Sequence, residues 1–139
     1  MNKLTPLSDL GMLEAAIAES RNRPVLLFKH SRLCGISCEA LDELRNHVAA
    51  CAADVIYRMI TVQSHRDVSD GAARTLGIRH ETPQAILVKD GQPVWSASHF
   101  RITAAELRQA VAAQANTARP APTLGRPGPD PRRADPAMS

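Results

Sequence analysis

Residues 25–38 read VLLFKHSRLCGISC and join an apolar run, a polar loop and the start of a helical pattern. The run Val25–Phe28 shows no polar alternation, which predicts a strand buried on both faces of a sheet. Beyond the loop Lys29–Gly35, apolar residues recur at helical spacing and predict a helix over Ile36–Ala52. Cys34 is therefore expected between a buried strand and a helix.

The patterns on either side of this segment predict further helices and strands in alternation. Ser8 and Asp9 are typical of a helix N-terminus, and Asp90-Gly91 is a strong hairpin signal. We expect helices at about 10–20, 36–52, 67–76 and after Thr103, and strands at about 25–28, 55–62, 85–88 and from Val94. Two strand–helix units followed by a hairpin predict an α/β fold, a central mixed four-stranded sheet flanked by helices.

Composition limits the classes of function. The 139 residues are 44% hydrophobic, which suits one domain, and only 3% aromatic, which does not favour stacking on nucleic-acid bases. The formal net charge of +3 comes from arginines in the C-terminal segment, so we expect no nucleic-acid partner. No signal peptide and no apolar run of about 18 residues is evident, so we expect a cytoplasmic protein with no membrane partner.

The chain changes character after Asn116. Six of the ten prolines lie between Pro120 and Pro136, mixed with Ala, Gly, Arg and Asp. A segment of this composition buries too little apolar surface to offset its loss of conformational entropy. We expect a folded domain over residues 1–116 and a disordered tail over 117–139.

Cys34 is the strongest candidate for a reactive group. At the first turn of a helix, free N–H groups and the positive end of the dipole favour a thiolate, the species that attacks disulfides. Lys29, His30 and Arg32 add positive charge nearby in sequence, and we take them as candidate substrate-binding residues. Position and residue type together predict thiol–disulfide exchange.

The residues that follow Cys34 predict a monothiol cycle. A two-cysteine redox motif would have its second thiol at Ser37, and a serine cannot resolve a mixed disulfide. Cys38 lies on the flank of the helix, where it is interpreted either as a backup resolving thiol or as a small half-buried residue. The candidate catalytic set is therefore Cys34, Ser37 and Cys38, while Cys51 is expected to be a buried core residue.

We expect no metal and no bound cofactor. Cys34 and Cys38 could be combined with His30 or His47, but this spacing matches no standard zinc pattern.

The second half of the chain resembles a thioredoxin. The likeness lies in 76-LGIR-79, in Thr82-Pro83 and in 86-ILVKDG-91. The resemblance implies that Pro83 is cis and faces the active-site cysteine, and that Thr82 offers backbone groups to an extended substrate.

A closer resemblance is to the YtxJ-like family of monothiol bacilliredoxins. It lies in 28-FKHS-31, 34-CGIS-37, 80-HETPQ-84 and Val94-Trp95 followed by Ser98-His99, within about Leu10 to Val111. It implies removal of bacillithiol from protein mixed disulfides in the bacterial cytoplasm, with bacillithiol as thiol co-substrate and bacillithiolated client proteins as partners. Members of that family usually have proline where this chain has Gly35, and Cys38 is also a departure.

Two other functions stay open. The motif 34-CGIS-37 also resembles the Cys-Gly-Phe-Ser motif of monothiol glutaredoxins, which bind an iron–sulfur cluster with glutathione. The Gly-Gly and acidic residue with which those proteins hold glutathione are replaced here by 95-WSASH-99. A non-catalytic thioredoxin-like adaptor, with an unreactive Cys34, is the other alternative.

Overall fold

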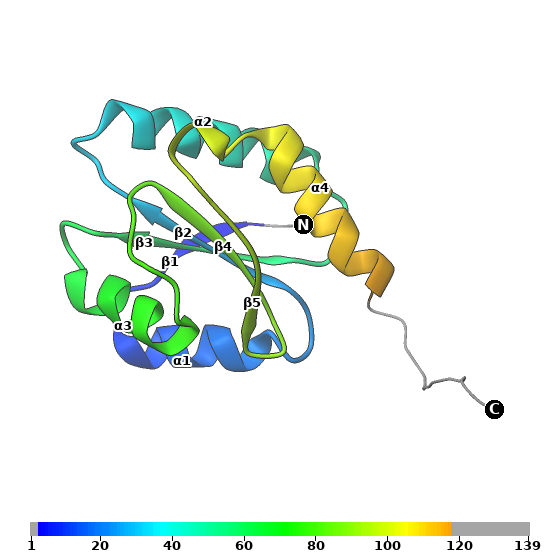
Figure 1. The fold of residues 1–139 in the computed structure, drawn as a ribbon, viewed down its shortest axis with the longest axis horizontal. Coiled ribbons are helices and arrows are strands. Elements are labelled where there is room, and N and C mark those ends of the chain that lie inside the picture. Colours follow the sequence, from blue (N-terminus) through cyan, green and yellow to red (C-terminus); the bar gives the residue numbers. More distant parts are fainter. Residues whose placement is uncertain (1–2, 118–139) are drawn as a thin grey trace.

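A five-stranded sheet lies between two layers of helices in the computed structural model, which describes residues 3–117 (Figure 1). Strands β1, β3 and β2 are parallel, whereas β4 pairs antiparallel with both β2 and β5. The strand order across the sheet is β1-β3-β2-β4-β5. The elements are β1 Leu4–Pro6, α1 Leu10–Glu19, β2 Val25–His30, α2 Gly35–Ala50, β3 Ile56–Thr61, α3 Arg66–Leu76, β4 Gln84–Lys89, β5 Gln92–Ser98, the 3-10 turn η1 His99–Arg101 and α4 Ala104–Thr117.

The two faces of the sheet carry separate hydrophobic clusters. Helices α2 and α4 cover one face and α1 and α3 the other, above and below the sheet in Figure 1. Leu26 and Phe28 point to the α2–α4 side, and Val25 and Leu27 to the α1–α3 side. Side chains of a strand alternate between the two faces of the sheet, and both faces are covered by helices here. Consecutive residues of β2 must therefore be apolar, which explains the uninterrupted run Val25–Phe28.

The α/β class and the mixed sheet are confirmed, but the predicted number of strands was wrong by one. The additional strand is β1, which pairs parallel with β3 through Leu4 opposite Tyr57. Three residues that include Pro6 are too few to show a strand alternation. Its pairing depends on a partner some fifty residues further along the chain, which local patterns do not reveal.

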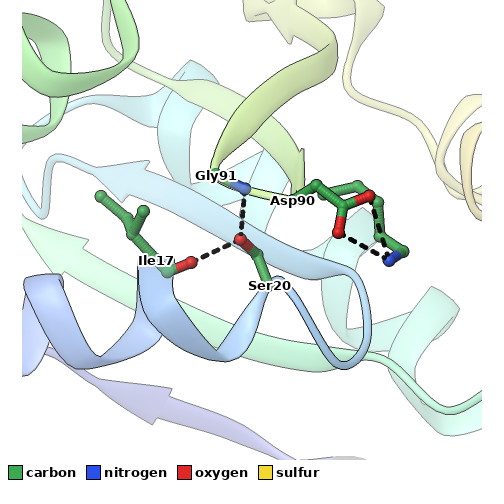
Figure 2. Close-up of polar contacts among 5 residues, drawn as sticks. Ile17, Ser20, Asp90 and Gly91 are labelled. Carbon is green, nitrogen blue, oxygen red and sulfur yellow. Dashed lines mark hydrogen bonds and ion pairs between the residues drawn. The ribbon is translucent and has the colours of Figure 1, made fainter.

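The predicted hairpin at Asp90-Gly91 is confirmed and lies at the end of the sheet away from Cys34. Asp90 and Gly91 both have positive φ, 54° and 76°, as a tight two-residue turn between antiparallel strands requires. The buried Ser20 anchors this turn, because its carbonyl accepts the Asp90 N–H at 2.8 Å and its hydroxyl accepts the Gly91 N–H at 2.9 Å. Figure 2 shows that hydroxyl donating to the Ile17 carbonyl, which ties the end of α1 to the turn.

Two predictions concern regions at the limits of the described chain. The expected tail, residues 117–139, lies outside the described residues except for Thr117, which ends α4. Within residues 3–117, no helix combines the length and apolar character that crossing a membrane requires.

Candidate functional site around Cys34

Cys34 is the N-cap residue of α2. Its backbone is extended, with φ −114° and ψ 120°, its carbonyl accepts the Cys38 N–H at 3.0 Å, and its side chain is half-buried. The first N–H groups of a helix lack intrahelical partners and, with the helix dipole, stabilise a negative charge at this end. The predicted position of Cys34, at a strand–loop–helix junction, is therefore confirmed.

The loop between β2 and Cys34 is held by side chains from two other elements. The Ser31 N–H donates to Ser37 Oγ on α2 at 2.9 Å. Gln63, which follows β3, donates from Nε2 to Ser31 Oγ at 2.6 Å and accepts the Arg32 N–H at 3.3 Å. The Cys34 N–H donates to the Ser31 carbonyl at 3.4 Å. These bonds position the loop and, through it, the sulfur.

His30 and Ser37 form a buried pair behind this loop. His30 Nδ1 lies 2.8 Å from Ser37 Oγ, and the two residues are 5% and 0% exposed. Because Ser37 Oγ already accepts the Ser31 N–H, its own hydroxyl is available to donate to His30 Nδ1, which corresponds to a neutral ring. Burial first, and then the charges of Arg45 and Arg32, lower the pKa of His30. His30 therefore does not supply the positive charge expected near Cys34.

The Thr82-Pro83 loop lies at the same end of the sheet as Cys34. The peptide bond between these two residues is cis, as the resemblance to thioredoxins implied. Lys29 pairs with Gln84 across the antiparallel strands β2 and β4. The chain that leaves β2 therefore passes beside the chain that enters β4, which brings the loop of Cys34 next to that of Pro83.

The family model of monothiol bacilliredoxin BrxC matches residues 5–107, most of the described chain. The chain belongs to this family.

Solved structures agree with this assignment. One described as a candidate oxidoreductase with a thioredoxin fold is 34% identical, covers 77% of this chain and 92% of its own, and has a TM-score of 0.70. Thioredoxins from Malassezia sympodialis and Fasciola hepatica are each 17% identical and cover 81% and 78% of this chain, 91% and 97% of their own, with TM-scores of 0.64 and 0.63. These two show the thioredoxin fold alone. Bacilliredoxin family and thioredoxin fold together support a thiol–disulfide oxidoreductase role.

The other two predicted catalytic residues of this bacilliredoxin lie on different faces of α2. Cys38 is exposed one turn beyond Cys34, so its thiol is accessible rather than half-buried. Ser37 is fully buried, and the structure gives it a positioning contact with the loop rather than a surface facing a substrate. Cys51 is half-buried at the C-cap of α2 and packs against the core, less deeply than expected.

The predicted substrate-binding residues are also divided by burial. Lys29 is fully buried and its Nζ lies 3.2 Å from His80 Nδ1, with its pKa lowered by burial and raised by Asp70 to a smaller extent. The structure thus does not bring the Lys29 side chain to the surface, and direct substrate contact is not available to it. Arg32 is exposed, and Thr82 is half-buried with Oγ1 3.3 Å from His80 Nε2.

Some residues near the site were not singled out from the sequence. Gln63 and Arg66 follow β3, and Ser69 on α3 lies 3.2 Å from His80 Nδ1. A signal existed, because residues after the carboxyl ends of parallel strands commonly form binding sites in α/β proteins. Among residues 3–117 no group of three or more His, Cys, Asp or Glu side chains is arranged to hold a metal ion.

Proposed function

We propose that this protein is a cytoplasmic monothiol oxidoreductase that removes bacillithiol from mixed disulfides on client proteins. The observation that carries the proposal is the placement of Cys34 at the start of α2, half-buried and beside the cis Thr82-Pro83 loop. Membership of the bacilliredoxin family supports the choice of bacillithiol and of the bacterial cytoplasm.

The reaction is a pair of thiol–disulfide exchanges. The Cys34 thiolate attacks the bacillithiol sulfur of the client disulfide, so a bond forms between Cys34 and bacillithiol while the client sulfur leaves as a thiolate and takes a proton. A second thiolate then attacks the bacillithiol sulfur bound to Cys34. If that thiolate is another bacillithiol, the products are bacillithiol disulfide and Cys34 thiolate, so the disulfide bond has passed from the client to a pair of bacillithiol sulfurs and no other oxidant or reductant is needed.

The surroundings of Cys34 suit a protein client. Leu33, immediately before it, is 89% exposed and offers an apolar contact to a docked chain. The resemblance to thioredoxins implies that backbone groups of Thr82, before the cis Pro83, also hydrogen-bond an extended client segment. Exposed Cys38 is one helical turn away, where Cα atoms are about 6 Å apart and a disulfide with Cys34 is geometrically accessible.

Mass spectrometry of the reaction with a bacillithiolated client tests this proposal. We expect the client to lose the adduct and wild-type protein to gain it on Cys34, with no transfer to Cys34→Ser. Cys51→Ala is the matched control and should behave as wild type. A client that keeps its bacillithiol in the presence of wild-type protein contradicts the proposal. A longer-lived adduct on Cys38→Ala than on wild type identifies Cys38 as a resolving thiol.

A further inference from the structure

A pocket of about 410 Å³ adjoins the loop of Cys34 on its α3 side. It lies where the ends of β2 and β3, the start of α3 and the loop before β4 meet, and its volume is within the range of small-ligand sites. The lining residues are Ser31, Val62, Gln63, Arg66, His80 and Thr82. All six lie in the described part of the chain, and no carboxylate is among them.

The lining is rich in hydrogen-bond donors. Arg66 is exposed and contributes a guanidinium, which binds carboxylates in a two-pronged geometry. The amide of Gln63 and the hydroxyl of Ser31 add further polar groups and are bonded to each other at 2.6 Å. The pocket therefore combines one permanent positive charge with neutral polar groups.

Buried Lys29 fixes the orientation of His80 from behind. Lys29 Nζ and Ser69 Oγ both lie 3.2 Å from His80 Nδ1. An ammonium group can only donate, so the contact with Lys29 makes Nδ1 the acceptor and leaves the ring proton on Nε2. That Nε2 lies 3.3 Å from Thr82 Oγ1, which then accepts and keeps its own hydroxyl proton to donate. These contacts give Lys29 a positioning role, because it orients His80 and, through His80, Thr82.

The surroundings of His80 favour its neutral form. Burial, then Lys29 and Arg66, lower the pKa of His80, while Asp70 and Glu81 oppose them. The permanent positive charge of the pocket is consequently that of Arg66.

The pocket is connected to Cys34 through Ser31. Ser31 lines the pocket with its own atoms, and its carbonyl accepts the Cys34 N–H. A ligand held in the pocket is therefore separated from the reactive sulfur by one short turn of backbone.

We propose that this pocket binds the carboxylate-bearing part of the small thiol in the mixed disulfide and so selects anionic thiols over uncharged ones. The inference rests on the proposed function and names the part of the site that recognises the thiol. Bacillithiol is a small thiol that carries carboxylate groups, and Arg66 is the residue expected to pair with them.

The test compares two adducts on one client protein, bacillithiol and uncharged 2-mercaptoethanol. We expect Arg66→Gln to lower kcat/KM for the bacillithiol adduct about tenfold or more, as for loss of a charged hydrogen bond, and to leave the 2-mercaptoethanol adduct unchanged. Arg74→Gln, an exposed arginine at the other end of α3, is the matched control and should change neither. An equal loss on both adducts overturns the inference, because Arg66 would then contact a carboxylate of the client.

Binding without chemistry separates this inference from the proposed function. S-methyl-bacillithiol has no free thiol, and its affinity for Cys34→Ser can be measured by calorimetry. We expect the additional change Arg66→Gln to weaken binding about tenfold, whatever the turnover of wild type. Equal affinity with and without Arg66 overturns the pocket assignment, whereas failure of wild type to remove either adduct overturns the proposed function alone.

Discussion

The two ends of α2 carry the same residue type in opposite environments. Cys34 is the N-cap and Cys51 the C-cap of this one helix. The dipole favours an anion at the first and disfavours one at the second. Cys34 lies beside a polar loop, whereas Cys51 packs against the core and forms a hydrogen bond with Tyr57. Position along a helix, rather than residue type, separates a candidate nucleophile from a structural thiol.

A buried histidine accompanies each cysteine, which extends the comparison. His30 contacts the Ser37 hydroxyl at 2.8 Å and His47 contacts the Tyr57 hydroxyl at 2.7 Å. Burial raises the pKa of Tyr57 and lowers that of His47, so the second pair is a neutral core contact. Only Ser37 also holds the backbone of the active-site loop. The two histidine–hydroxyl pairs are therefore alike, and they differ in that Ser37 of the first pair also binds the loop before Cys34.

Exchanging each cysteine is expected to give the largest contrast between the two ends. Cys34→Ser should lower the rate of transfer from a bacillithiolated client by about 10³-fold or more, because the nucleophile is lost. Cys51→Ala should stay within about twofold of wild type. Stopped-flow transfer kinetics make the measurement. Similar losses in both variants contradict the assignment of Cys34.

Removal of the hydroxyls tests whether only one pair serves the site. Ser37→Ala leaves the half-buried Ser31 N–H and the buried His30 without their partner, and we expect a loss of about 1–3 kcal/mol in the free energy of unfolding. The loosened loop should also slow transfer by about tenfold, because small misplacements of a reacting atom are costly. Tyr57→Phe should cost a similar stability with little change in rate.

Urea unfolding and the transfer assay, run on the same preparations, separate the two effects. Ser37→Thr keeps a hydroxyl and is the conservative control, expected to restore part of the rate. A Ser37→Ala protein that is destabilised yet transfers at the wild-type rate shows that the pair at the N-terminal end is structural only.

Local patterns were sufficient for most of the fold and for Cys34. The apolar run at Val25, the helical spacing after Gly35 and the turn residues Asp90-Gly91 each reflect interactions over a few residues. These signals decide the order of elements, and the order leaves few topologies open. Cys34 could be placed because a strand–loop–helix junction is visible in sequence.

The contacts around Cys34 could not be predicted, because they join distant segments. Gln63 holds Ser31 across 32 positions, and His80 meets Lys29 across 51. Positive charge near Cys34 in sequence suggested substrate binding by Lys29. However, β2 continues through Lys29, and its side chain is buried beside His80. The rule that charged residues lie at the surface fails here because the fold places a polar partner, His80, beside the buried ammonium group of Lys29.

Acid should destabilise the protein through both buried histidines. The folded-state pKa values of His30 and His47 are lowered by burial, so the unfolded chain binds more protons as pH falls through its own value near 6.5. The free energy of unfolding should therefore rise with pH up to about pH 6.5 and level off above it. The slope should be at most about 1.4 kcal/mol per pH unit for each histidine.

Urea unfolding at pH 5.5, 6.5 and 7.5 measures this slope. We expect a difference of about 1–3 kcal/mol between the extremes for wild type and a shallower dependence for His47→Gln, which removes one of the histidines whose pKa burial lowers. A stability that is flat over the range would show that both histidines charge readily in the folded state.

The smallest expected effect concerns Gly35, the first residue of α2. A Cβ built there meets nothing within 4 Å, and the extended backbone of Cys34 is the conformation that a following proline requires. Proline is favoured at the first position of a helix, so Gly35→Pro should stabilise the protein by about 0.5–1 kcal/mol by restricting the unfolded chain. Ala50→Pro, at the last position of the same helix, should instead cost about 3 kcal/mol or more. Thermal unfolding of both variants measures the difference in stability between the two ends of α2. A destabilised Gly35→Pro would contradict the prediction, because it would mean that proline does not fit the backbone at the start of this helix.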